Sequence, residues 1–148
     1  MFFFQLPVLP ELFCRLGDWE ILERLLRSAT HGCRSAGAIS EEEMEAWKYT
    51  FARSGFTAPI NYYRANVGKT GPSSSSSSSQ TARKKAKIAN PVLIIWGTED
   101  AFLHKNLAQL SVKLVENGSL KYIEGASHWV QQDRPSEVNE YMKEFLVN

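Results

Sequence analysis

The chain has 148 residues, of which 43% are hydrophobic and 11% aromatic, and its formal net charge is +1. This length and composition are typical of a soluble globular protein. The balanced charge gives no general attraction to nucleic acid or to an anionic membrane surface, so no nucleic-acid partner is expected. No apolar run approaches the roughly 18 residues that a membrane span needs.

The N-terminal residues give no targeting signal. Met1–Leu9 is apolar, but no basic segment precedes it, and Pro7 and Pro10 interrupt it. We therefore expect neither a signal peptide nor a membrane anchor. Cys14 and Cys33 lack metal-ligand spacing, which favours two reduced thiols, no metal site and no cofactor. The compartment is otherwise undetermined, with the cytoplasm as the default.

Residues 1–67 have the pattern of a helical lid. Apolar residues from Leu12 to Leu26 have helical spacing, and Gly17–Asp18 divides them into two short helices. Ser40 with Glu43 forms a capping-box pattern that predicts a helix start. Thr57-Ala58-Pro59 predicts a further short helix, which carries Tyr62 and Tyr63.

Residues 68–87 differ in kind from both flanking parts. Gly71-Pro72 precedes the serine run Ser73–Ser79, and a basic cluster follows at Arg83-Lys84-Lys85. Such low-complexity sequence lacks the apolar side chains that would offset its ordering entropy. We expect a disordered linker or insertion here.

Residues 88–148 read as a βαβα unit. The expected elements are a strand at Pro91–Trp96, a helix at Lys105–Glu116 closed by Asn117-Gly118, a strand at Leu120–Ile123, and a helix starting at Pro135. The last helix carries an apolar stripe of Val138, Met142, Phe145 and Leu146. The fold class is therefore α/β, with two parallel strands of a doubly wound sheet and their flanking helices.

An acid and then a histidine follow these two strands. Glu99 and Asp100 come after the first strand, and His128 comes after the second. This is the order in which α/β-hydrolases carry the last two members of their catalytic triad. His31 and His104 lack such a setting, and we interpret both as surface residues.

Three segments resemble the epoxide hydrolase family of α/β-hydrolases. They are Leu93–Phe102, Ser127–Pro135 and, in the cap of that family, Pro59–Asn66. The first residues, Met1–Pro7, are similar to the entry into the cap. The resemblance covers the C-terminal half of the family: the cap and the last two βα units.

The resemblance implies a role for six residues. Asp100 is the acid, selected over Glu99 by the family pattern, His128 is the base, and Tyr63 is one of two tyrosines that activate the epoxide. Phe4, Phe102 and Trp129 are expected to line the substrate pocket. The implied partner is a small epoxide, either a lipid or a xenobiotic, in a full-length relative.

The family's nucleophile is an aspartate on a strand–turn–helix elbow, and the sequence has no Gly-x-Asp-x-Gly or Gly-x-Ser-x-Gly. The nearest imitation, Cys33–Gly37, is interpreted as a surface loop. We therefore expect a truncated hydrolase that is inactive alone and prone to self-association through an exposed strand edge. Two alternatives are a dehalogenase-like hydrolase part and a non-catalytic binding or regulatory partner of a full-length hydrolase.

Overall fold

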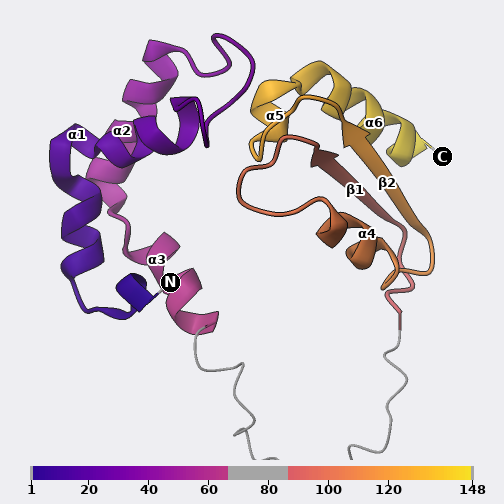
Figure 1. Ribbon diagram of the computed structural model, residues 1–148, viewed down its shortest axis with the longest axis horizontal. Coiled ribbons are helices and arrows are strands. Elements are labelled where there is room, and N and C mark those ends of the chain that lie inside the picture. Colours follow the sequence, from indigo (N-terminus) through magenta and orange to yellow (C-terminus); the bar gives the residue numbers. More distant parts are fainter. Residues whose placement is uncertain (1, 67–86, 148) are drawn as a thin grey trace, which may run out of the picture. The chain divides into compact units, whose positions relative to one another are not determined.

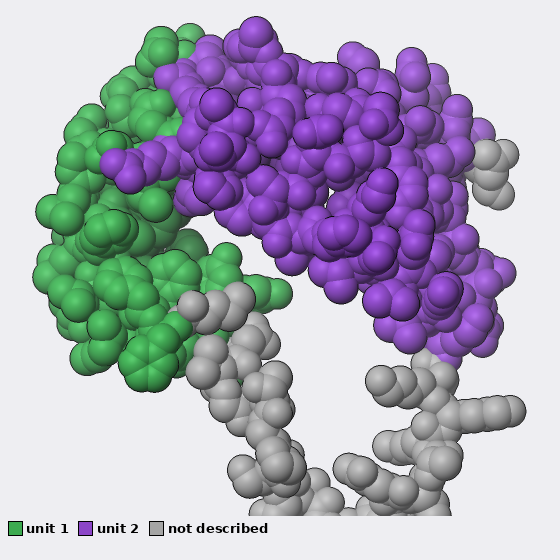
Figure 2. Space-filling model, viewed as in Figure 1, with its two compact units in different colours: residues 1–23, 41–82 green, residues 24–40, 83–148 purple. Residues whose placement is uncertain are grey.

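The structure is a computed structural model that describes residues 2–66 and 87–147. Nearly all of the predicted linker at 68–87 lies outside the described residues. The described chain forms two compact units, shown in green and purple in Figure 2. The helical unit holds the chain up to Glu23 and again from Glu41, and the strand unit holds Arg24–Ser40 together with the C-terminal part.

The described part of the helical unit contains helices only. A 3₁₀ helix, η1 (Phe2–Gln5), is followed by α1 (Leu9–Arg27), α2 (Glu41–Ser54) and α3 (Thr57–Asn66). The last part of α1 belongs to the strand unit. The helix starts predicted after Ser40 and at Thr57 are confirmed, and Tyr62 and Tyr63 lie on α3 as expected.

A kink divides α1 at the predicted position. Backbone angles are non-helical from Leu16 to Trp19, and φ is +60° at Gly17 and +52° at Asp18. A left-handed backbone costs little at glycine, which explains why the break occurs here. The expectation of two short helices is confirmed, and Trp19 then stacks on Phe56 with ring centroids 5.7 Å apart.

The strand unit contains a two-stranded parallel sheet. Strand β1 (Val92–Gly97) pairs in register with β2 (Gly118–Ile123), with Ile94 opposite Leu120. Helix α6 (Pro135–Val147) and helix α4 (Asn106–Val112) flank this sheet (Figure 1). Strand alternation places Ile95 on the same face as Ile123, where both belong to one apolar cluster with Val138 of α6.

The predicted helix at Lys105–Glu116 is too long. Helix α4 ends at Val112, because the chain after it enters a short β-bridge between Val115 and Ile88. The Ile88 N–H donates to the Leu114 carbonyl at 2.8 Å, and the Glu116 N–H donates to the Ile88 carbonyl at 2.9 Å. Gly118 then begins β2, so the prediction that it closes a helix is wrong.

Much apolar surface of the strand unit is open. Along β1, each residue from Val92 to Trp96 is only partly buried, and β1 pairs with no strand other than β2 among the described residues. In α6, Met142 is 47% and Leu146 is 76% exposed.

No helix in the described part of the chain is long and apolar enough to cross a membrane.

Candidate functional site

Gly97 lets the loops after β1 and β2 meet. A Cβ atom at this position would lie 2.2 Å from the Ser127 carbonyl oxygen and 2.4 Å from that of Ala126, so no side chain fits. The Glu99 N–H then donates to the Ala126 carbonyl at 2.9 Å. The acid loop and the histidine loop are therefore joined backbone to backbone at the carboxyl end of the sheet, where open α/β folds bind ligands.

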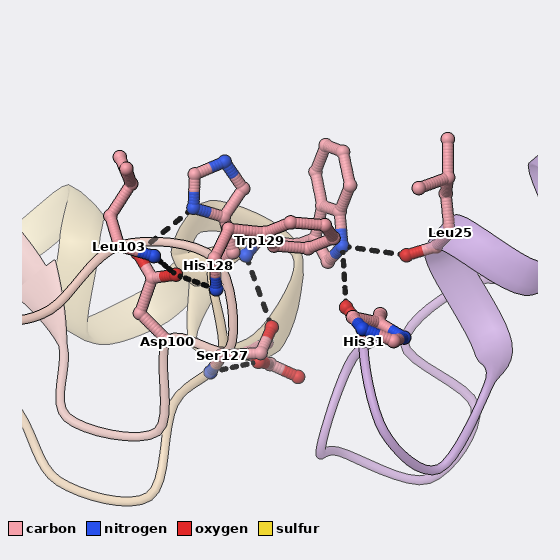
Figure 3. A network of polar contacts seen from close by, with 9 residues as sticks. Leu25, His31, Asp100, Leu103, Ser127, His128 and Trp129 are labelled. Atoms are coloured by element: carbon pink, nitrogen blue, oxygen red, sulfur yellow. Dashed lines mark hydrogen bonds and ion pairs between the residues drawn. The ribbon is translucent and has the colours of Figure 1, made fainter. Parts of the chain in front are cut away.

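Asp100 is oriented by its own loop. Its Oδ1 atom accepts hydrogen bonds from the backbone N–H groups of Phe102 at 2.8 Å and Leu103 at 2.9 Å. Its Oδ2 atom lies 2.9 Å from Nδ1 of His128 (Figure 3). Glu99, by contrast, is exposed. Of the two predicted acid candidates, Asp100 is the one that contacts His128.

The carboxyl group of Asp100 stays ionised at neutral pH. Burial by itself would raise its pKa, since the side chain is only 7% exposed. The hydrogen bonds from His128, Leu103 and Phe102 together outweigh burial and hold the pKa below its ordinary value. An ionised carboxylate has no proton to donate, so Nδ1 of His128 is the donor in this pair.

This hydrogen bond sets the tautomer of the histidine. With Nδ1 carrying the proton, Nε2 of the neutral imidazole has a free lone pair and can accept a proton. The His128 side chain is 33% exposed, which leaves it open to a water or substrate molecule. The pair thus has the arrangement of a general base and its orienting acid.

Aromatic side chains surround His128. The ring centroid of Phe102 lies 5.0 Å and that of Trp129 lies 5.3 Å from the imidazole centroid. The Trp129 indole N–H donates to the carbonyls of Leu25 at 2.8 Å and His31 at 3.0 Å (Figure 3). Both aromatic residues named from the sequence therefore lie beside the histidine, and their place in a substrate pocket stays a prediction.

The other two histidines lie at the surface, as expected. The His104 Nδ1 atom accepts only a long bond, 3.3 Å, from the Asn106 backbone. The ring of His31, however, lies 5.2 Å from that of Phe102, centroid to centroid, and so borders the aromatic cluster. No local sequence pattern around His31 could have predicted this contact, because His31 and Phe102 are 71 positions apart in the sequence.

Sequence reasoning missed one buried carboxylate. Asp133, 4% exposed, accepts a hydrogen bond from the backbone of Ser127 and two from the backbones of Arg34 and Ser35. In the sequence, Asp133 could have been noticed because it lies within Ser127–Pro135, one of the segments that resemble the epoxide hydrolase family.

The Cys33–Gly37 segment is an irregular loop, as the sequence predicts. Burial and the nearby Asp133 raise the pKa of the Cys33 thiol to about 11, which makes it a poor nucleophile.

Tyr63 and Phe4 belong to the helical unit. Their ring centroids are 5.1 Å apart, and the Tyr63 side chain is 40% exposed. Arg64 of α3 connects this helix to the N-terminal segment. It donates to the carbonyls of Phe4 and Leu6 at 2.8 and 2.7 Å and forms an ion pair with Glu11 at 2.6 Å. The catalytic role of Tyr63 and the pocket role of Phe4 stay predictions.

No group of three or more His, Cys, Asp or Glu side chains able to hold a metal ion occurs within residues 2–66 and 87–147. Cys14 and Cys33 are both free thiols. At the carboxyl end of the sheet, His128 with Asp100 as its hydrogen-bond partner has the geometry that proton transfer requires.

Comparison with known proteins gives matches along nearly the whole chain. No family model matches it. The chain is 40% identical over 148 residues to Epoxide hydrolase 1 of Caenorhabditis elegans and 37% identical over 149 residues to Epoxide hydrolase 3 of Xenopus tropicalis. Each match covers 99% of this chain but only 34% and 38% of the respective relative.

Solved structures show the same fold. An epoxide hydrolase of Bacillus megaterium in complex with an inhibitor has a TM-score of 0.74 at 21% identity, covering 98% of this chain and 49% of that one. Epoxide hydrolase A of Mycobacterium thermoresistibile has a TM-score of 0.74 at 22% identity, covering 99% and 51%. The resemblance predicted from the motifs is confirmed: nearly the whole chain is similar to part of these epoxide hydrolases, and it shares the α/β-hydrolase fold of the solved structures over that part.

Proposed function

We propose that this chain supplies the acid–histidine pair and one cap tyrosine of a site that hydrolyses epoxides to diols. The observation that carries the proposal is the 2.9 Å hydrogen bond between Asp100 and Nδ1 of His128, on loops that follow adjacent parallel strands. The family resemblance gives the substrate class. The proposal assigns the nucleophile to a carboxylate outside these 148 residues.

The first chemical step forms an ester. A carboxylate oxygen attacks an epoxide carbon, the ring C–O bond breaks, and the ring oxygen takes a proton from a phenol, for which Tyr63 is the candidate. A tyrosine hydroxyl suits this role because its ordinary pKa, near 10, keeps it protonated at neutral pH. The product of this step is a hydroxyalkyl ester of the enzyme.

The second step hydrolyses that ester. Nε2 of His128 accepts a proton from water, and the water oxygen attacks the ester carbonyl carbon. The ester C–O bond then breaks, and the leaving alkoxide receives the proton back from the imidazolium, which completes the diol. The nucleophile is released as a carboxylic acid, and its proton returns to the phenolate left by the first step, so that both groups regain their starting states. Asp100 stabilises the imidazolium while it exists.

A chimera tests the proposal. In Epoxide hydrolase 1 of C. elegans, the segment that matches this chain would be replaced by this chain, and hydrolysis of styrene oxide would be measured. We expect turnover by the chimera, and a loss on the order of 10³-fold or more in His128→Ala. His104→Ala, an exposed histidine in the same unit, is the matched control and should leave the rate unchanged.

Two further variants separate the roles. Asp100→Asn should lower turnover through the wrong tautomer of His128, and Tyr63→Phe should slow ester formation but not ester hydrolysis. The chain by itself should be inert toward styrene oxide. Retained turnover in His128→Ala, or turnover by the isolated chain, would contradict the proposal.

A second, non-catalytic role is favoured by the open face of the strand unit. A groove of about 410 Å³ beside β1 is lined by five apolar side chains, namely Leu93, Ile95, Met142, Phe145 and Leu146. We propose that this face and the β1 edge mediate association with a second copy of this chain. Sedimentation velocity over a concentration series should show association that Leu146→Glu weakens. A concentration-independent monomer would refute this second role.

A further inference from the structure

Asp133 is a buried carboxylate that accepts hydrogen bonds from three backbone N–H groups. Its Oδ2 atom accepts the Ser127 N–H at 2.6 Å, and its Oδ1 atom accepts the N–H groups of Arg34 at 2.6 Å and Ser35 at 2.9 Å. The Ser35 hydroxyl also donates to the Asp133 carbonyl at 2.8 Å. Burying a charge is costly unless it is well hydrogen-bonded, and these donors meet that requirement.

The donors of Asp133 show why a carboxylate is needed. Three N–H groups point at two oxygen atoms, and an amide at this position would turn one acceptor into a donor. Burial alone would raise the pKa of Asp133, but hydrogen bonds from the side chain of Ser127 and from the backbones of Ser35, Ser127 and Arg34 hold it below its ordinary value. At neutral pH the group is therefore an anion that links the histidine loop to the Cys33–Gly37 loop.

The backbone on both sides of His128 is held. On one side, the Ser127 N–H binds Asp133 at 2.6 Å. On the other, the Trp129 N–H donates to Oγ of Ser127 at 3.0 Å, and the Trp129 indole binds the Leu25 and His31 carbonyls. Asp100 fixes the imidazole ring itself. The ring and the backbone of His128 thus have two separate constraints.

We propose that Asp133 is a positioning residue for the general base, because its carboxylate fixes the backbone from which His128 reaches Asp100. This inference rests on the proposed function of the Asp100–His128 pair. A base misplaced by even about 1 Å loses much of its catalytic effect. Asp133 touches no reacting atom in this scheme and acts only through the position of His128.

The first test uses the full chain and needs no turnover. Proton NMR should show a low-field resonance for the Nδ1–H of His128 hydrogen-bonded to Asp100, absent in Asp100→Asn. We expect Asp133→Asn to broaden or shift this resonance while the amide resonances of β1 and β2 keep their positions. Glu124→Gln is the matched control, because Glu124 is an exposed carboxyl on the loop that carries His128. An unchanged resonance in Asp133→Ala would overturn the inference.

The second test uses the chimera and separates the two chemical steps by single-turnover kinetics. Asp133→Asn should slow ester hydrolysis on the order of tenfold and Asp133→Ala on the order of 10²-fold, with ester formation unchanged. A residue with a merely structural role would reduce the amount of active enzyme and affect both steps equally. Equal effects on both steps, or no effect, would refute the positioning role.

The same assay distinguishes this inference from the function it rests on. If His128→Ala leaves ester hydrolysis intact, the proposed function itself fails. If His128→Ala accumulates the ester but Asp133→Ala hydrolyses it at the normal rate, only the positioning role of Asp133 fails.

Discussion

The strand unit and the helical unit hold their candidate site residues by different means. In the strand unit, Asp100 and His128 contact each other, and backbone N–H groups orient the carboxylate. In the helical unit, Tyr63 rests against Phe4, and the side chain of Arg64 secures the segment that carries Phe4. Backbone donors are set by the fold, whereas a side-chain clamp must order its own rotamers.

This difference shows that the geometry of the acid–base pair is built within the strand unit alone. The Asp100–His128 pair is complete within one unit, since every hydrogen bond that orients it lies between strand-unit residues. Tyr63 has an orientation within its own unit only, so its proposed role depends on the substrate and on the other unit. Changes in the strand unit should therefore affect the pair strongly, and changes in the helical unit should not.

The largest effect is expected at Gly97. In Gly97→Ala, the new Cβ atom would fall 2.2 Å from the Ser127 carbonyl, and only backbone movement could relieve the clash. We expect the strand unit to lose about 3 kcal/mol or more of stability. Gly37→Ala is the control: its φ is +71°, but apart from its chain neighbours no atom of the described residues lies within 4 Å of the new Cβ, so it should cost only about 1 kcal/mol. Urea denaturation followed by hydrogen exchange of each unit would measure both, and equal costs would contradict the close-packing argument.

The next effect concerns Asp133 and depends on pH. Its folded pKa is lowered, so its contribution to stability is fully present above about pH 4 and is lost as the pH falls through the folded pKa. Asp133→Asn should cost about 2 kcal/mol at pH 7, with a smaller difference from the unchanged chain at pH 3. Urea unfolding across this pH range is the measurement. A difference that stays constant with pH would show that the charge of Asp133 is unimportant.

A smaller loss is expected at Trp129. Trp129→Phe keeps an aromatic ring but removes the indole N–H shared by the Leu25 and His31 carbonyls, at a cost of about 1 kcal/mol. Trp96→Phe is the matched control, because the buried Trp96 indole N–H has no hydrogen-bond partner among the described residues. Thermal unfolding of both variants should rank Trp129→Phe as the less stable. The opposite ranking would argue against a role for the indole bond.

The smallest effect on the strand unit is expected from Arg64→Ala. This change removes the bonds to the Phe4 and Leu6 carbonyls and the pair with Glu11, so amides near η1 should exchange faster with solvent. Amides of β1 and β2 should keep their exchange rates. Arg53→Ala, which removes an exposed contact to Tyr49, serves as control. Faster exchange of the β1 and β2 amides would show that the strand unit, and with it the Asp100–His128 pair, depends on the helical unit.

The sequence alone determined most of the elements, although not the end of α4, and it determined the two residues that meet at the carboxyl end of the sheet. Runs such as Val92–Trp96 show strand patterning, and parallel strands bring the loops at their carboxyl ends to one edge. Asp100 and His128 could therefore be expected to lie close together from their positions after consecutive strands. The break at Gly17 and the start of α3 at Thr57 were equally local, since caps and glycine conformations depend on few neighbours.

Only the tertiary structure decided the contacts between distant segments. The end of α4 at Val112 depends on the bridge between Ile88 and Val115, and the clamp of Asp133 depends on Arg34 and Ser35, nearly a hundred residues earlier. No local pattern encodes such pairs, because each partner is an ordinary loop residue until the fold brings them together. Burial then gives those hydrogen bonds their weight, since an unpaired polar group inside the protein costs more than one in water.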